Sequence, residues 1–185
     1  MTRMPSPRIG AIQVPHAGRD GRANDGGFIT LRVAPATLAE APQVVDVIAA
    51  AFLNDPTWSW AFPDPSARRR WWQSCTQGAL RHPWVLRTGG FETVSVWIPP
   101  DGTEFSPEEE ARLPDLLTEL VGQRALEVTE LLQRFGDAHP RHTPHYYLSL
   151  LATADEHRGR GLGMALLREN LARIDLEGIP AYLES

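Results

Sequence analysis

A glycine-rich segment with two arginines is the part of this sequence whose residue types and spacing are best suited to chemistry. It reads Arg158-Gly-Arg-Gly-Leu-Gly163, and it stands between an apolar run of strand length and a stretch with helical periodicity. Glycines let backbone amides approach an anion closely, and the first amides of a helix have no partner within that helix. Arg158 and Arg160 add positive charge. The segment therefore predicts a site for a phosphate or pyrophosphate group.

Two common nucleotide-binding loops fit this segment poorly. A Walker loop requires a lysine, whereas all 18 basic residues of this chain are arginines. A Rossmann fingerprint requires a third glycine at the position where this sequence has Met164, and it follows its strand directly. Both nucleotide-binding folds are therefore disfavoured.

The segments that must position this loop alternate between strands and helices. Alternation of apolar and polar residues predicts five strands, at residues 28–33, 84–87, 93–98, 145–153 and 181–184. Helical spacing predicts helices at residues 37–52, 64–81, 106–136 and 162–178.

Local signals refine the ends of these helices. Thr37 with Glu40, and Ser106 with Glu109, have the spacing of capping boxes, and Asp64 is expected to be an N-cap. Within the third helix, Pro114 is expected to interrupt the helical pattern.

Further expectations concern helix ends, faces and connections. Gly136 should end the third helix and Gly178 the last one. Residues 54–63 are expected to be a loop. The last helix is expected to have one apolar face, made of Met164, Leu167, Leu171 and Ile174.

Residues 1–27 are expected to form a disordered tail, followed by a single domain over residues 28–185. The tail contains several prolines and glycines and shows little apolar periodicity. It also lacks the apolar core of a signal peptide. An arm that touches a partner is the alternative.

Composition limits the classes of protein that this chain can belong to. It has 185 residues, of which 42% are hydrophobic, and a formal net charge of −5. This composition is typical of a globular domain, and a negative charge disfavours a nucleic-acid partner. No apolar run is long enough for a membrane span, so no membrane partner is expected. The single Cys75 forms no intramolecular disulfide and is expected in the core, which fits a cytoplasmic protein.

The segment 158–163 matches the Arg/Gln-x-x-Gly-x-Gly/Ala signature, so the chain resembles the GNAT superfamily of N-acetyltransferases. Within it, the chain looks most like puromycin N-acetyltransferase and its uncharacterised relatives, a resemblance that implies an enzyme of the antibiotic-modifying type. The local likeness extends to Ala50-Ala-Phe52, Tyr147-Leu148, Asp155-Glu-His157 and Gly178-Ile-Pro-Ala-Tyr-Leu-Glu184. The resemblance covers residues 30–185. It implies an α/β (α+β) fold with a mixed, mostly antiparallel central sheet flanked by helices, truncated after the fifth strand.

The resemblance implies acetyl-CoA as a co-substrate. In the family, the preceding strand pairs with the pantetheine arm, a role that maps to Leu151, Ala152 and Thr153. An amide near Leu151 would stabilise the oxyanion. The signature loop holds the pyrophosphate, and its residues here are Arg158, Gly159, Arg160, Gly161, Leu162, Gly163 and Met164.

The implied reaction is attack of a small-molecule primary amine on the acetyl thioester, which requires a base because the amine arrives protonated. Glu184 is the first candidate for this catalytic base, since related enzymes place a glutamate at the end of that strand. His145 and Asp55 are weaker candidates. No metal site is expected, because prolines interrupt the segment that contains His139 and His145. Four tryptophans could form the acceptor pocket or pack in the core, namely Trp58, Trp60, Trp71 and Trp72.

Members of the family continue beyond the segment that ends this sequence, into a helix bearing a proton-donating tyrosine and a final strand pair. The sequence therefore predicts that the 185-residue chain acetylates poorly or not at all. A non-catalytic acyl-CoA-binding module is the alternative function. Acetylation of a protein or tRNA amine is a third and weaker one. The open edge at residues 181–184 would allow a homodimer.

Overall fold

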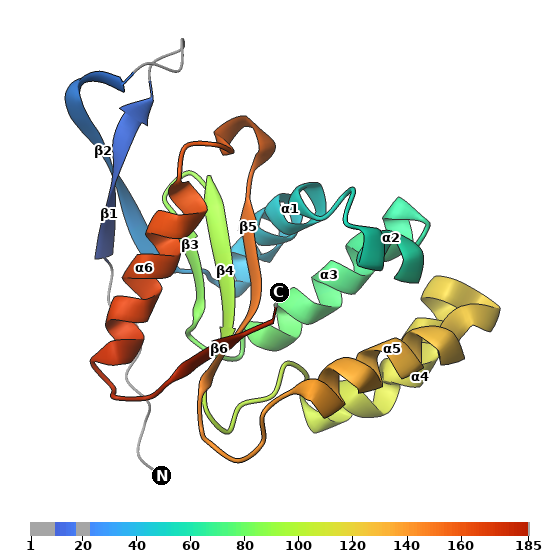
Figure 1. Ribbon diagram of the computed structural model, residues 1–185. Helices are drawn as coiled ribbons and strands as arrows, with labels where there is room; N and C mark the ends of the chain where they lie inside the picture. The colour runs from blue at the N-terminus through green and yellow to red at the C-terminus, as the bar shows by residue number, and fades with distance from the viewer. Residues whose placement is uncertain (1–9, 18–22, 185) are drawn as a thin grey trace.

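A twisted sheet with helices on both faces forms the centre of the computed structural model, which describes residues 10–17 and 23–184 (Figure 1). Within these residues the sheet has six strands in the order of the chain. All neighbouring strands are antiparallel except the last two, which are parallel. The strands are β1 (Gly10–Ala17), β2 (Ala23–Pro35), β3 (Val85–Thr88), β4 (Thr93–Ile98), β5 (Tyr146–Thr153) and β6 (Ala181–Leu183). The expected mixed, mostly antiparallel sheet is confirmed.

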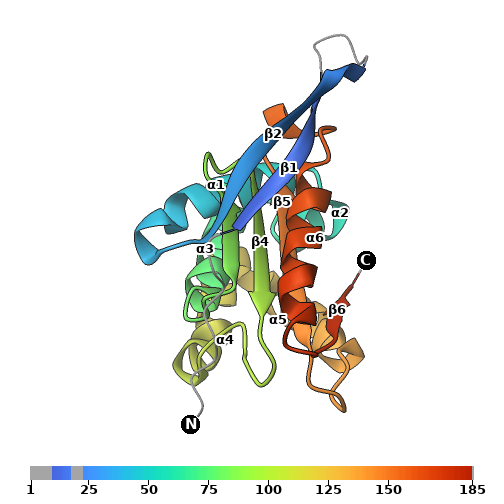
Figure 2. The same ribbon diagram turned by 90° about the vertical axis from the view of Figure 1, so that its left-hand side faces the viewer.

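The helices divide between the two faces of the sheet, as the side view in Figure 2 shows. Those of the described residues are α1 (Ala41–Ala51), α2 (Pro56–Ala61), α3 (Pro65–Ala79), α4 (Pro107–Val121), α5 (Ala125–Ala138) and α6 (Leu162–Asp175). Helices α1 and α3 pack on one face in a core to which α4 and α5 contribute, and α6 packs on the other face in a second core. Among the described helices, none combines the length and the apolar character that crossing a bilayer requires.

Short capping signals start the helices. The Ser106 Oγ accepts from the Glu109 amide at 3.2 Å, and the Glu109 carboxylate accepts from the Ser106 amide at 2.7 Å, so this capping box is confirmed. Asp64 caps α3 by accepting from the Ser66 amide, also as expected. Asp55 caps α2 in the same way, although residues 54–63 are expected to be a loop. That expectation is wrong, because Asp55 and the proline that follows it repeat the signal that begins α3.

In the helical hairpin of α4 and α5, neither Pro114 nor Gly136 interrupts or ends a helix as expected. Pro114 lies inside α4 without interrupting it, and the chain breaks at Gly122 instead. Pro114 and Glu110 are both exposed, so water can reach the carbonyl that the missing proline amide would have bonded. Helix α5 continues past Gly136 to Ala138, so that glycine does not end it.

The N-terminal segment differs from the expected tail wherever the structure describes it. Residues 10–17 form β1 and residues 23–27 belong to β2, where the sequence analysis expects disorder. The register pairs Ile12 with Leu31 and Val14 with Ile29. Two short alternating segments thus satisfy each other's backbone groups in a hairpin, which neither could do alone. Residues 1–9 and 18–22 lie outside the described part.

Helix α6 faces the sheet with a set of residues that matches the expected one in part, because Ile174 is buried and Leu167 and Leu171 pack against the same core. Its buried face contains Leu162, Leu166, Asn170 and Ile174, which are four residues apart, whereas Met164 is 52% exposed. Residues at that spacing lie on one helix face. Of the four expected residues, Met164 alone lies away from this core.

Candidate functional site

Strands β5 and β6 separate beside an irregularity in the sheet. They pair only from Tyr146 to Leu148, and within the described residues no strand covers that side of β5 further on. On the other side, β4 pairs with β5 through Leu148 and then Leu150, which leaves Ser149 as a bulge. An uncovered backbone edge therefore runs from Ser149 to Thr153, a length of about 13 Å at about 3.3 Å per residue.

The start of α6 adjoins the end of this edge. Gly161 is the N-cap and has a left-handed backbone with φ of 72°, and it provides no side chain to satisfy the first amides of the helix. At Gly163, a Cβ would lie only 3.0 Å from the Thr153 Oγ1. The absence of that side chain lets the helix start approach β5 closely. The structure therefore brings the predicted loop, residues 158–164, next to the predicted strand segment, residues 151–153.

The two arginines of the loop have local partners. Arg158 donates from Nη2 to the carbonyl of Ala51, at the end of α1, over 2.9 Å, and its Nε lies 3.1 Å from the Asp155 carboxylate. The Arg160 Nη1 lies 2.9 Å from the His157 Nδ1. The contact with Ala51 holds the loop near α1, and the other two tie the arginines to the residues just before the loop.

A cavity of about 360 Å³ lies beside the bulge, on the face covered by α3 to α5. Trp58, Trp71 and Trp72 line it, and the rings of Trp58 and Trp72 meet edge to face at 4.8 Å between centroids. Trp60 does not, because it is 49% exposed and lies under the guanidinium of Arg124. Three of the four predicted tryptophans therefore surround one cavity.

Glu184 also lines this cavity, as expected for the first candidate base. Its Oε1 accepts from the Tyr182 hydroxyl at 3.4 Å and lies 3.7 Å from the His139 Nδ1. Burial and the neighbouring His145 lower the pKa of His139 below its usual range. The weaker candidate Asp55 caps α2 instead of lining the cavity. His145 lies outside it too, with its Nε2 3.0 Å from that of His139.

A second carboxylate of this cavity, Glu104, was missed by the sequence analysis. Its Oε1 accepts a hydrogen bond of 2.5 Å from the Ser149 hydroxyl, and burial raises the pKa of Glu104 above its ordinary value. Burial likewise raises the pKa of Tyr147, which lines the same cavity and stays protonated near neutral pH. No motif surrounds Glu104 in the sequence, so no local signal indicates its place.

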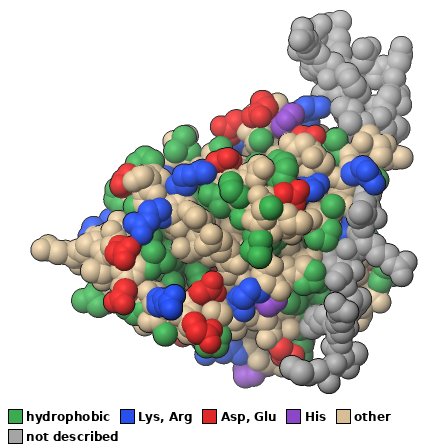
Figure 3. All heavy atoms as spheres, turned by 180° about the vertical axis from the view of Figure 1, so that it is seen from behind, with side chains coloured by type: hydrophobic (Ala, Val, Ile, Leu, Met, Phe, Trp, Pro, Cys, Tyr) green, Lys and Arg blue, Asp and Glu red, His purple; other side chains and the backbone are tan. Residues whose placement is uncertain are grey.

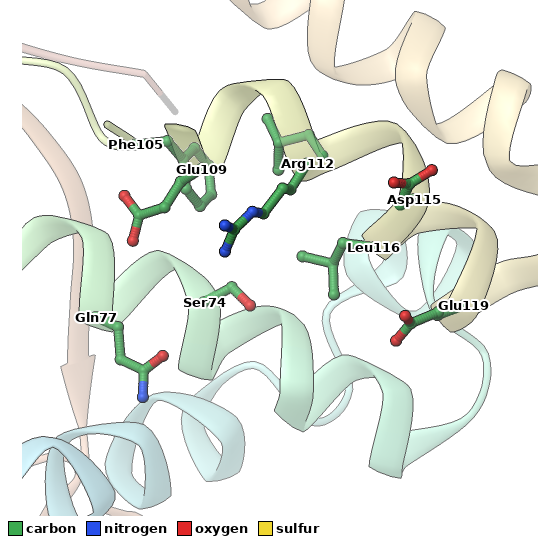
Figure 4. Close-up of a pocket in the computed structure, with 9 residues that line it drawn as sticks. Ser74, Gln77, Phe105, Glu109, Arg112, Asp115, Leu116 and Glu119 are labelled. Atoms are coloured by element: carbon green, nitrogen blue, oxygen red, sulfur yellow. The ribbon is translucent and has the colours of Figure 1, made fainter. Parts of the chain in front are cut away.

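Another hollow, of about 530 Å³, lies between α3 and α4 (Figure 4). Phe105 and Leu113 separate it from the tryptophan-lined cavity, since both residues line both spaces. Charged side chains of both signs surround it, including Arg112 and Asp115. The face of the molecule in Figure 3 likewise carries interspersed acidic and basic side chains.

Cys75 lines the tryptophan-lined cavity and contributes packing to it. Cys75 is buried in the core, where burial raises the pKa of its thiol, so it acts there as a small packing residue. Within the described ranges, no three side chains of metal-ligating type gather as a metal site would require.

Two solved structures are similar to this chain along most of its length. No family model matches the chain. A structure from Corynebacterium glutamicum, named as "histone acetyltransferase HPA2 and related acetyltransferase", is 28% identical, covers 83% of this chain and 75% of its own, and has a TM-score of 0.51. A protein of the yellow fever mosquito, named as an arylalkylamine N-acetyltransferase, is 15% identical over 94% of this chain and 73% of its own. Its TM-score is also 0.51, and at that identity it shows the fold alone.

The fold and the Corynebacterium neighbour together indicate the class of protein. The sheet flanked by helices is the fold of GNAT acetyltransferases, and the comparisons support N-acetyltransferase by family. They support acyl transfer as the general type of reaction.

Proposed function

We propose that this chain transfers the acetyl group of acetyl-CoA to a primary amine of a small molecule. The observation that carries the proposal is the uncovered edge of β5, which runs from the bulge to the glycine start of α6. An extended chain with amide groups can pair with such an edge as an added strand, as the pantetheine arm would at residues 151–153. The free amides at the helix start, preceded in the chain by Arg158 and Arg160, suit the pyrophosphate.

The cavity beside the bulge suits the acceptor. Its tryptophans can pack against an apolar or planar body, and the carboxylates of Glu104, Glu110 and Glu184 favour a positively charged amine. None of its lining residues is an arginine. We therefore propose an amine with an apolar body as the acceptor, in an antibiotic-modifying enzyme related to puromycin N-acetyltransferase.

The chemistry requires a group that accepts a proton and a donor for the oxyanion. Glu184, at the end of β6, is the sequence-based candidate for the proton acceptor, and it lines the acceptor cavity. A bulge leaves backbone groups of the extra residue unpaired, so an amide between Ser149 and Leu151 is a candidate donor to the thioester carbonyl.

An assay of amine-dependent thiol release tests the proposal. The chain is incubated with acetyl-CoA and either 2-phenylethylamine or an aminonucleoside with an aromatic side chain, and the acetylated amine is identified by mass. We expect CoA release that depends on the amine and an equal amount of acetylated product. Acetyl-CoA binding without amine-dependent release would contradict acetyl transfer and indicate an acyl-CoA-binding module. The rate also decides whether turnover is as slow as the sequence predicts.

A further inference from the structure

The segment that carries Glu104 packs closely against the C-terminal end of α3 and the residues that follow it. The carbonyl of Thr103 accepts from the Arg81 Nη2 at 3.1 Å and lies 3.0 Å from the His82 Nε2. A Cβ on Gly78 would lie 2.3 Å from the carbonyl oxygen of Glu104, so only glycine lets these backbones approach so closely. Groups held in this way keep the geometry that catalysis needs.

The side chain of Glu104 is tied to the bulge of β5. Its carboxylate accepts from Ser149, the extra residue at the point where β5 and β6 separate. Because the bulge changes the alternation of β5, both Ser149 and Leu150 line the cavity. The carboxylate therefore lies at the junction of the acceptor cavity and the edge that would hold the thioester.

No ion pair of the described residues involves Glu104, although the adjoining hollow that Glu104 also lines contains Arg141, His142 and His145. Every neighbouring element contributes one titratable group to the cavity lining, namely Cys75 of α3, Glu110 of α4, His139 just after α5, Tyr147 of β5 and Glu184 just after β6. A carboxylate in such surroundings costs stability, and groups of this kind are concentrated at functional sites.

We infer that Glu104 is the catalytic base of the proposed acetyl transfer, with Ser149 as its positioning residue. The Glu104 carboxylate accepts one proton from the ammonium group of the acceptor, directly or through one water. The freed nitrogen lone pair forms the C–N bond at the thioester carbonyl, and the C–S bond breaks. The second proton of the nitrogen passes to the leaving sulfur, which becomes the thiol of CoA. Glu104 later releases its own proton to solvent.

The position of Glu104 distinguishes it from the sequence-based candidate. Glu184 lies at the exposed end of β6, where its partners are Tyr182 and His139. Glu104 lies at the bulge itself, and burial raises its pKa towards the range in which a carboxylate is an effective base. Substitution of Glu104 and substitution of Glu184 should therefore affect the rate differently.

Glu104→Gln tests the assignment because the amide keeps the size of the side chain and an oxygen that can accept from Ser149. With 2-phenylethylamine as acceptor, we expect kcat/KM to fall about 100-fold or more, with the acetyl-CoA Kd unchanged within about twofold. In Glu184→Gln, kcat/KM should fall by much less. Glu130→Gln, an exposed carboxylate of α5 outside the cavity, should match the unchanged chain.

Ser149→Ala gives a readout that a structural role would not produce. The hydrogen bond from Ser149 lowers the pKa of Glu104, so its removal should move the rising limb of the pH–rate profile to higher pH. Difference infrared spectra against Glu104→Gln should show a protonated carboxyl that titrates above about 4.3, the ordinary glutamate pKa.

The outcomes separate the two proposals. A Glu104→Gln variant with an unchanged rate and pH profile, or a profile that Ser149→Ala does not shift, overturns the assignment while acetyl transfer stands. An unchanged chain that binds acetyl-CoA but never acetylates the amine overturns acetyl transfer, and the role of Glu104 with it.

Discussion

Gly161 and Gly163 contribute to the same helix start in two different ways. Gly161 adopts a left-handed backbone that directs the chain into α6, while Gly163 leaves room for the end of β5. Together they place free amides beside an uncovered strand edge. This placement supports the proposed anion site at the segment more specifically than a glycine-rich turn alone would.

Substitution of Gly161 tests this role against a matched control at the other end of α6. Gly161→Ala and Gly178→Ala both impose an alanine on a left-handed backbone, with φ of 72° and 67°, and neither added Cβ meets an atom within 4 Å. Both should therefore lower the free energy of unfolding by about 1 kcal/mol.

Only Gly161→Ala should weaken acetyl-CoA binding, by about tenfold or more, because only this residue directs the amides at the start of α6. Titration calorimetry and urea unfolding of the two variants measure both effects. Equal losses of affinity would show that the helix start does not hold the ligand.

At the residue scale, the sequence identifies the part of the site that is local in the chain. Residues 158–164 form one motif, and the sequence alone indicates their anion chemistry. Glu104 is different, because it becomes significant only through Ser149, which lies 45 positions further along the chain. A bulge depends on how two strands pair, so no property of the segment around Glu104 could predict that contact.

At the scale of elements, β4 joins the two halves of the site. Along one edge it pairs with the bulged β5. On the face of the sheet that α6 covers, its side chains hold that helix through Asn170. The Asn170 Oδ1 accepts from the Ser95 Oγ at 2.7 Å and from the Trp97 Nε1 at 2.8 Å, and all three residues are buried. This polar contact fixes how α6 lies on the sheet and therefore where its amides begin.

Asn170→Ala should destabilise the protein by removing the acceptor of both hydrogen bonds. Two buried donors would be left without a partner, which should lower the free energy of unfolding by about 1–3 kcal/mol. Arg168→Ala, an exposed substitution on the same helix, should change it by no more than about 0.5 kcal/mol. Urea unfolding measures both values. A loss for Asn170→Ala as small as that of the control would contradict this account of α6.

The sequence predicts the central strands β3 to β5 better than the helix boundaries, but it misses β1 and the start of β2. The predictions near β4 and β5 are close to the structure because β4 is rich in β-branched residues and β5 is a largely apolar run with two tyrosines. Helix α2 was missed because six residues give too short a pattern, although Asp55 provides its cap. Pro114 was given too much weight, since an exposed proline can be tolerated where water reaches the freed carbonyl.

At the scale of the whole molecule, the parts of the proposed site come from both faces of the sheet. Helix α6 provides the anion site from one face, and the segment holding Glu104 provides the acceptor cavity from the other (Figures 1 and 2). Strand β5 lies between them and is the element that both sites share. The acetyl group would therefore be transferred at the bulge, where the two halves meet.

Titration calorimetry of the chain with acetyl-CoA, beside NADH, tests the central claim most directly. We predict saturable binding of one acetyl-CoA and no binding of NADH, since the edge of β5 suits an amide-bearing arm that NADH lacks. Desulfo-CoA should also bind, because it keeps the pyrophosphate and most of that arm. A folded chain that binds none of these compounds, or that binds NADH as well as acetyl-CoA, would contradict the account.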